Sequence, residues 1–234
     1  SFSRCSGQRI FSSRMAHVLF ASDAMSRTVR EVYAAAIEDP RIVALAIGTR
    51  PDCVADDVLD LIDEFAARIP VSIEYGMQTR HDRSLIWMNR GHDHAAFVDA
   101  MQRSRGRKFE ICAHVMLGLP NESHDDMLAT AAELTRLKVD SLKIHNLYCV
   151  RNTPLEAQVA AGEVRLMEFD EYLETLIAFL ERTPADVVVE RISGEAPDDW
   201  FIGPAWCLDK PAIRRELLAR MESRDTWQGK CVAP

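Results

Sequence analysis

Three short polar segments of this sequence carry the side chains best suited to bind a polar ligand. They are residues 48–52 (GTRPD), residues 74–79 (EYGMQT) with the following 89–92 (NRGH), and residues 114–122, which end in GLPNE. An amide such as that of Gln78 offers both a donor and an acceptor to hydroxyl groups. The planar guanidinium fork of Arg90 suits the two oxygens of a carboxylate.

Hydrophobic periodicity places these segments just after predicted strands. From Ser26 onward, apolar residues recur alternately with helical and with strand spacing. The predicted strands are 42–47, 71–75, 109–117, 141–148 and 186–192. The predicted helices are 29–37, 58–69, 85–88, 95–103, 123–134, 172–180 and 211–224, with a capping-box signature at Ser123 and Asp126. This alternation indicates right-handed crossovers and a parallel sheet, with the polar segments at the carboxyl ends of its strands.

One face of the predicted strands is polar or small, which favours a barrel over an open sheet. The residues that alternate onto this face are Ser72, Glu74, Gly76, Cys112, His114, Lys143 and His145. A parallel sheet covered by helices on both faces should be apolar on both, whereas a ligand-binding barrel has a polar inner face. The fold class predicted is therefore α/β, a partial (β/α) TIM-like barrel. Glu74 and Lys143 are expected to point inward, either with a function or as a simple charge pair.

The order of the motifs resembles a known family. A G-x-Q-T sequence followed by N-R-G-H, and then a strand ending in G-L-P-x-E, is similar to radical-SAM enzymes related to the Elongator catalytic subunit and to anaerobic coproporphyrinogen oxidases. With GTRPD and the tail 225–230 (DTWQGK), the stretch 29–192 looks most like a bacterial branch of these proteins. The resemblance implies S-adenosylmethionine and a 4Fe–4S cluster as cofactors, which together generate a 5′-deoxyadenosyl radical that removes hydrogen from a substrate.

The resemblance also assigns roles to individual residues. Gln78 matches a position that hydrogen-bonds the ribose of S-adenosylmethionine, and Arg90 matches one that pairs with its methionine carboxylate. His114 stands where some relatives carry an aspartate that touches the ribose. Gly118 and Pro120 are expected to shape the loop that passes the adenine. No residue is assigned a catalytic role, and no metal ligand is assigned.

The cysteines do not match the family pattern. Family members bind the cluster through a CxxxCxxC motif, whereas the six cysteines of this chain, Cys5, Cys53, Cys112, Cys149, Cys207 and Cys231, have no short spacing. The cluster is therefore a family expectation whose ligands are absent from these 234 residues. Scattered thiols are typical of a cytoplasmic protein rather than of a secreted disulfide framework.

The N-terminal segment does not match the family. Residues 1–22 contain three arginines, six serines and no acid, a composition typical of a transit peptide, although a truncated or misread N-terminus explains it equally well. We predict three parts: the non-matching segment 1–25, the N-terminally incomplete barrel 26–210, and a helix and tail over 211–234. One further strand is possible at 17–21. Without it, the apolar strand 42–47 would be an open edge and would favour self-association.

Composition limits the partners. A net charge of −8 argues against a surface that coats nucleic acid, and no apolar run reaches the ~18 residues of a membrane span. The substrate is expected to be a small molecule or a transfer RNA. Two alternatives stay open: a non-catalytic truncated barrel that serves as a binding or interaction module, and a metal-dependent barrel hydrolase. The candidate ligands of the hydrolase are His81, His92, His94, His114 and His145.

Overall fold

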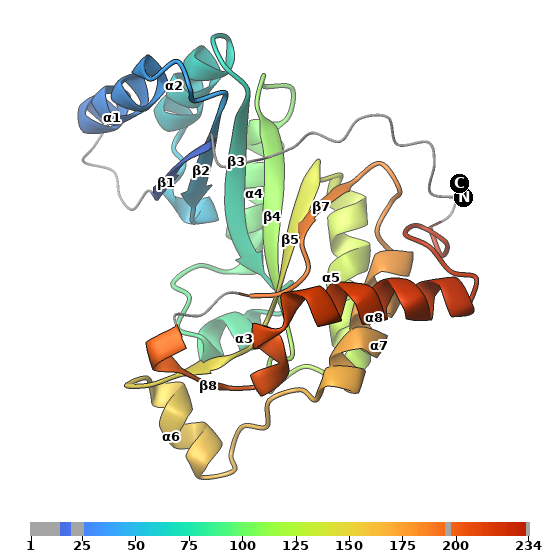
Figure 1. Ribbon diagram of the computed structural model, residues 1–234. Coiled ribbons are helices and arrows are strands. Elements are labelled where there is room, and N and C mark those ends of the chain that lie inside the picture. Colours follow the sequence, from blue (N-terminus) through green and yellow to red (C-terminus); the bar gives the residue numbers. More distant parts are fainter. Residues whose placement is uncertain (1–14, 20–25, 195–197, 233–234) are drawn as a thin grey trace.

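A computed structural model describes residues 15–19, 26–194 and 198–232 of the chain, and its main feature is one parallel sheet (Figure 1). The strands are β1 (Met15–Leu19), β2 (Ala44–Thr49), β3 (Val71–Gln78), β4 (Glu110–Leu117), β5 (Ser141–Asn146) and β7 (Val188–Arg191). Their order in the sheet follows the chain, and every neighbouring pair is parallel. In the described residues no pairing joins β7 to β1, so the sheet is an unclosed, partial barrel. The predicted α/β fold class is confirmed.

Helices bury their apolar faces against one side of the sheet. They are α1 (Ser26–Glu38), α2 (Asp56–Ala66), α4 (His94–Ser104), α5 (His124–Leu137) and α7 (Phe169–Glu181), joined by α8 (Lys210–Ser223) after the last strand. The two short helices α3 (Asp82–Trp87) and α6 (Pro154–Ala160) contribute no residue to the main core. The main core contains Leu59, Phe97, Leu134 and Leu176 from helices and Leu45, Ile73, Val115 and Ile144 from strands. Each such side chain stabilises the fold by roughly 1.5–3 kcal/mol when it leaves water. The helices therefore cover the face of the sheet on which the apolar strand residues lie.

Local hydrogen bonds set several element boundaries. Helix α5 begins with the predicted capping box, in which the Ser123 side chain accepts from the Asp126 backbone N–H and the Asp126 side chain accepts from the Ser123 backbone N–H. Strand β2 begins two residues later than predicted, because a turn from Asp39 to Ile42 precedes it. Strand β3 runs to Gln78, three residues beyond its predicted end.

The N-terminal edge of the sheet differs from the sequence prediction. A strand was expected at 17–21; the structure has β1 at Met15–Leu19, paired with β2 from Met15↔Ala44 to Leu19↔Gly48, while residues 20 and 21 lie outside the described part. The prediction that β2 is an open edge is therefore wrong, because β1 supplies its missing hydrogen bonds. Self-association of the chain stays a prediction. The three-part division of the chain remains a prediction, although β1 lies inside the segment that was left out of the barrel.

Short elements cluster at the end of the sheet toward which β3 points (Figure 1). They are η1 (Pro51–Cys53), β6 (Cys149–Val150), η2 (Asp198–Trp200), β8 (Phe201–Gly203) and η3 (Ala205–Leu208), together with α3 and α6. No pattern in the sequence predicted the antiparallel pair β6 and β8. Among the described helices, none has both the length and the apolar composition needed to cross a membrane.

Candidate functional site

Gln78 and Arg90 meet over Gly76 at the carboxyl end of β3. The Arg90 guanidinium donates from Nη2 to the Gly76 carbonyl oxygen at 3.4 Å. A Cβ atom at position 76 would lie 2.2 Å from Arg90 Nη2 and 2.9 Å from Gln78 Nε2. Both side chains therefore occupy space that only glycine leaves open. The sequence predicted Gln78 and Arg90 as site residues, but it did not single out Gly76.

The backbone at the end of β3 is irregular. The pairing of β3 with β4 shifts register between Tyr75 and Gln78, and Gln78 has φ +66°, in the left-handed region. A non-glycine residue in that region is uncommon, and such bulges and strained residues gather near functional sites. The bulge ends the strand in the candidate site and sets the direction of the Gln78 amide.

The Arg90 guanidinium retains hydrogen-bonding capacity. Its Nε atom is buried and has no hydrogen-bond partner in the part of the chain that the structure describes. Burial lowers the pKa of Arg90, the neighbouring Arg50 lowers it further, and Asp52 opposes both effects. A buried donor without a partner costs free energy, so this arginine is suited to an anionic ligand that would satisfy it.

A pocket of about 520 Å³ reaches Arg90. It is lined by Leu85, Ile86, Asn89, Arg90, Gly91, His92, Asp93 and Ala96. Its volume falls within the range of small-molecule sites. His92 contributes a buried Nε2 atom that finds no hydrogen-bond partner among the described residues, and burial lowers the pKa of this histidine. Arg90 and His92 thus line the same pocket.

A buried charge network lies on the inner face of the sheet. His114 Nε2 is 2.9 Å from Glu74 Oε2, Lys143 Nζ is 2.5 Å from Glu74 Oε1, and Lys143 is 3.6 Å from Glu190. Burial raises the pKa of Glu74, but the hydrogen bonds from His114 and Lys143 outweigh it and lower the pKa to about 2. The His114 ring stacks on His145, with centroids 5.4 Å apart. The predicted inward direction of Glu74 and Lys143 is confirmed, and the pair extends to His114 and Glu190.

The loop after β4 passes close to other parts of the fold. Gly118 has φ +87°, and a Cβ atom there would lie 2.8 Å from Met167 Sδ. The next residue, Leu119, is buried, whereas Pro120 is exposed. Burial raises the pKa of Glu122 at the end of the loop, and the hydroxyls of Thr79 and Ser84 oppose that shift. The loop is therefore packed against the end of β3, next to Gln78.

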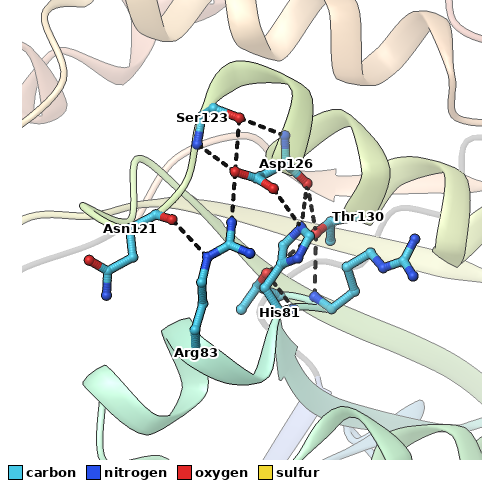
Figure 2. A network of polar contacts seen from close by, with 8 residues as sticks. His81, Arg83, Asn121, Ser123, Asp126 and Thr130 are labelled. Atoms are coloured by element: carbon cyan, nitrogen blue, oxygen red, sulfur yellow. Dashed lines mark hydrogen bonds and ion pairs between the residues drawn. The ribbon is translucent and has the colours of Figure 1, made fainter.

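A polar network ties this loop to the segment after β3 (Figure 2). The Asp126 carboxylate accepts from the backbone N–H and hydroxyl of Ser123, and it lies 2.7 Å from Arg83 Nη2. Arg83 also donates from Nε to the Asn121 carbonyl oxygen at 3.0 Å, and His81 Nε2 lies 3.0 Å from the Asp126 carbonyl oxygen. The guanidinium of Arg83 and the bonds from Ser123 hold the pKa of Asp126 well below its usual range. These hydrogen bonds and the ion pair thus hold the segment after β3 against the loop after β4 and the start of α5.

The five candidate metal-binding histidines do not form one site. His81 lies against Asp126, His94 Nε2 is 3.0 Å from Glu133, and His114 bonds Glu74. In the described ranges, no group of three or more histidines, cysteines, aspartates and glutamates is placed to hold a metal ion.

The described cysteines likewise do not provide a cluster site. Cys112, Cys149, Cys207 and Cys231 are free thiols, Cys53 Sγ lies 4.0 Å from Asp52 Oδ1, and Cys5 lies outside the described part. Burial raises the pKa of Cys112 and Cys207, which disfavours the thiolate that an iron–sulfur cluster requires. Residues 15–19, 26–194 and 198–232 therefore do not fit a 4Fe–4S cluster.

A parallel sheet flanked by helices, with polar groups gathered at the carboxyl ends of its strands, is typical of the class of TIM-like barrel proteins. Comparison with known families narrows this class. The profile of the Radical SAM superfamily matches residues 16–134, and that of the Radical_SAM C-terminal domain matches residues 139–223. The chain belongs to the radical SAM superfamily.

Individual relatives agree with this assignment. The chain is 33% identical to the Bacillus subtilis (strain 168) protein YtqA over 202 residues, which are 86% of this chain and 63% of YtqA. It is 36% identical to Escherichia coli (strain K12) YhcC over 182 residues, 77% of this chain and 59% of YhcC. The chain thus spans less than two thirds of these relatives. The structure of Methanocaldococcus infernus Elp3 with an N-terminal deletion (1-46) superimposes with a TM-score of 0.69 at 20% identity, covering 87% of this chain and 47% of Elp3. In sequence, the chain is 25% identical to Elongator complex protein 3 of Bos taurus over 161 residues, 67% of this chain and 29% of that protein, so the predicted resemblance to Elongator-related radical-SAM proteins is confirmed.

Proposed function

We propose that this chain binds S-adenosylmethionine at the carboxyl ends of β3 and β4 and takes part in radical-SAM chemistry. The convergence of Gln78 and Arg90 over Gly76 supports this proposal most directly. Arg90, with its buried and unpartnered Nε, binds the methionine carboxylate. Gln78 hydrogen-bonds the ribose, and the loop at Gly118 and Pro120 passes the adenine.

The protein's part in the reaction is to bind and orient. S-adenosylmethionine supplies the reactive sulfonium when bound, and the side chains fix its position. His114 lies on β4 beside the end of β3, since its neighbour Val115 pairs with Gln78. Its Nε2 is committed to Glu74, so only Nδ1 is available to a ribose hydroxyl. The described residues offer no site for a 4Fe–4S cluster.

The test of this proposal is the binding of S-adenosylhomocysteine, measured by calorimetry on the whole chain. Arg90→Ala and Gln78→Ala should each weaken binding by about 10-fold or more, because each removes a hydrogen bond that a charged or polar ligand group would otherwise receive. Gln102→Ala, on an exposed position of α4, is the control and should leave the affinity unchanged. Tight binding that survives both site substitutions would refute the assignment.

A second prediction concerns iron. After anaerobic reconstitution, the isolated 234-residue chain should contain less than one cluster equivalent of iron and sulfide, because no three cysteines approach the required spacing. Iron and sulfide analysis with an absorbance spectrum measures this. Stoichiometric loading with a broad band near ~400 nm would show that other residues bind the cluster.

A further inference from the structure

Arg50 connects two motifs that lie far apart in the sequence. It precedes η1 in the GTRPD segment and forms a bidentate pair with Asp52, with Nε 2.9 Å from Oδ1 and Nη2 2.5 Å from Oδ2. The same Nη2 donates to the carbonyl oxygen of Gly91 at 3.2 Å. Arg50 therefore joins the end of β2 to the NRGH segment, which contains Arg90.

The contact with Gly91 is close. Gly91 has φ +74°, and a Cβ atom there would lie 3.1 Å from Arg50 Nη1 and 3.3 Å from Nη2. A side chain at position 91 would strain the backbone and displace the guanidinium. This glycine thus permits both the turn after Arg90 and the approach of Arg50 to the backbone.

Arg90 lies near one positive and one negative side chain, Arg50 and Asp52. Arg50 lowers the pKa of Arg90, and Asp52 raises it. The hydrogen bonds from Arg50 lower the pKa of Asp52, so this carboxylate stays ionised. Asp52 is thus paired with Arg50, and the Arg90 guanidinium keeps donors for an anionic group of a ligand. Asp52 accepts hydrogen bonds from the Arg50 guanidinium, whereas the Nε of Arg90 has no hydrogen-bond partner among the described residues.

We propose that Arg50 is a positioning residue: held by Asp52, it fixes the Gly91 carbonyl and so directs the Arg90 guanidinium toward the carboxylate of the bound ligand. This inference rests on the proposed function. Arg50 acts on the amino-acid end of the ligand only, through Arg90, and does not touch the nucleoside end. The GTRPD motif thereby acquires a role that does not depend on a direct side-chain contact with the ligand.

The test compares S-adenosylhomocysteine with 5′-methylthioadenosine, a nucleoside that lacks the amino-acid carboxylate. Arg50→Gln should weaken S-adenosylhomocysteine binding about 10-fold and leave 5′-methylthioadenosine binding unchanged. Arg50→Lys should behave like Arg50→Gln, because lysine keeps the charge but cannot bond Asp52 and Gly91 as a fork. In an Arg90→Gln background, Arg50→Gln should have no further effect, since a residue that acts only through Arg90 has nothing left to position.

The matched control is Arg41→Gln. Arg41 forms the same kind of bidentate pair with Asp39, also two residues away, and should not affect either ligand. Equal losses for both ligands after Arg50→Gln, additive losses with Arg90→Gln, or full rescue by Arg50→Lys would each overturn the positioning role. If the wild-type chain binds neither ligand, the proposed function fails, and this inference with it. If it binds both and Arg50→Gln changes nothing, this inference alone fails.

Discussion

Replacement of Lys143 by methionine should lower the free energy of unfolding by about 3–5 kcal/mol, the largest loss we expect from a single substitution. Lys143 is 6% exposed, and its ammonium group lies between the carboxylates of Glu74 and Glu190. Methionine fills a similar volume but removes the cation that pairs with the buried Glu74 carboxylate and the partly buried Glu190 carboxylate. Urea unfolding at pH 7 measures the loss.

The pH dependence identifies the cause of this loss. In the folded chain the pKa of Glu74 is lowered to about 2, whereas a glutamate in an unfolded chain has a pKa of about 4.3. Ionised Glu74 therefore contributes stability above the unfolded value, and this contribution disappears as the pH falls toward 2. The difference between the wild-type chain and Lys143→Met should accordingly shrink below about pH 4.

Two further variants test this explanation. The double variant Glu74→Gln with Lys143→Met should regain much of the lost stability, because it removes the uncompensated charge. Lys108→Met, at an exposed position, should change the free energy of unfolding by less than about 0.5 kcal/mol. A Lys143→Met variant as stable as the Lys108→Met control would show that the charge network contributes little to folding.

The second large effect is expected for Gly76→Ala, on ligand binding rather than on stability. The new Cβ would lie 2.2 Å from Arg90 Nη2, so the guanidinium must leave the end of β3. Because the displaced atoms belong to flexible side chains, the fold should tolerate the change. Calorimetry should show S-adenosylhomocysteine binding weakened about 100-fold, the combined loss of two polar contacts.

Gly203→Ala provides the matched control for this prediction. A Cβ atom at position 203 would have Leu166 Cδ1 as its nearest neighbour, at an ordinary 3.8 Å. This variant should bind the ligand like the wild-type chain and unfold at a similar temperature. Unchanged binding by Gly76→Ala would mean that Arg90 does not bind the ligand from its observed position. A large loss of stability would mean that Gly76 is needed chiefly for folding.

The sequence by itself determined the alternation of strands and helices, the polar inner face and the order of the binding motifs. These features follow from local rules. Side chains alternate along a strand, so Cys112 and His114 must share a face, and the capping box at Ser123 needs only Asp126 three residues later. The family motifs are also local, which explains why the sequence alone predicts Gln78 and Arg90 as site residues.

Only the tertiary structure decided which of these residues touch. Glu74, Lys143 and Glu190 come from β3, β5 and β7, and their contacts depend on the register between strands, which no local pattern specifies. The need for glycine at position 76 arises from a side chain 14 residues away that returns over the strand end. The parallel pairing of β1 with β2 likewise joins segments that are distant in the sequence, so no local pattern specifies it. Periodicity determines the face on which a side chain lies, whereas packing and register determine its neighbours.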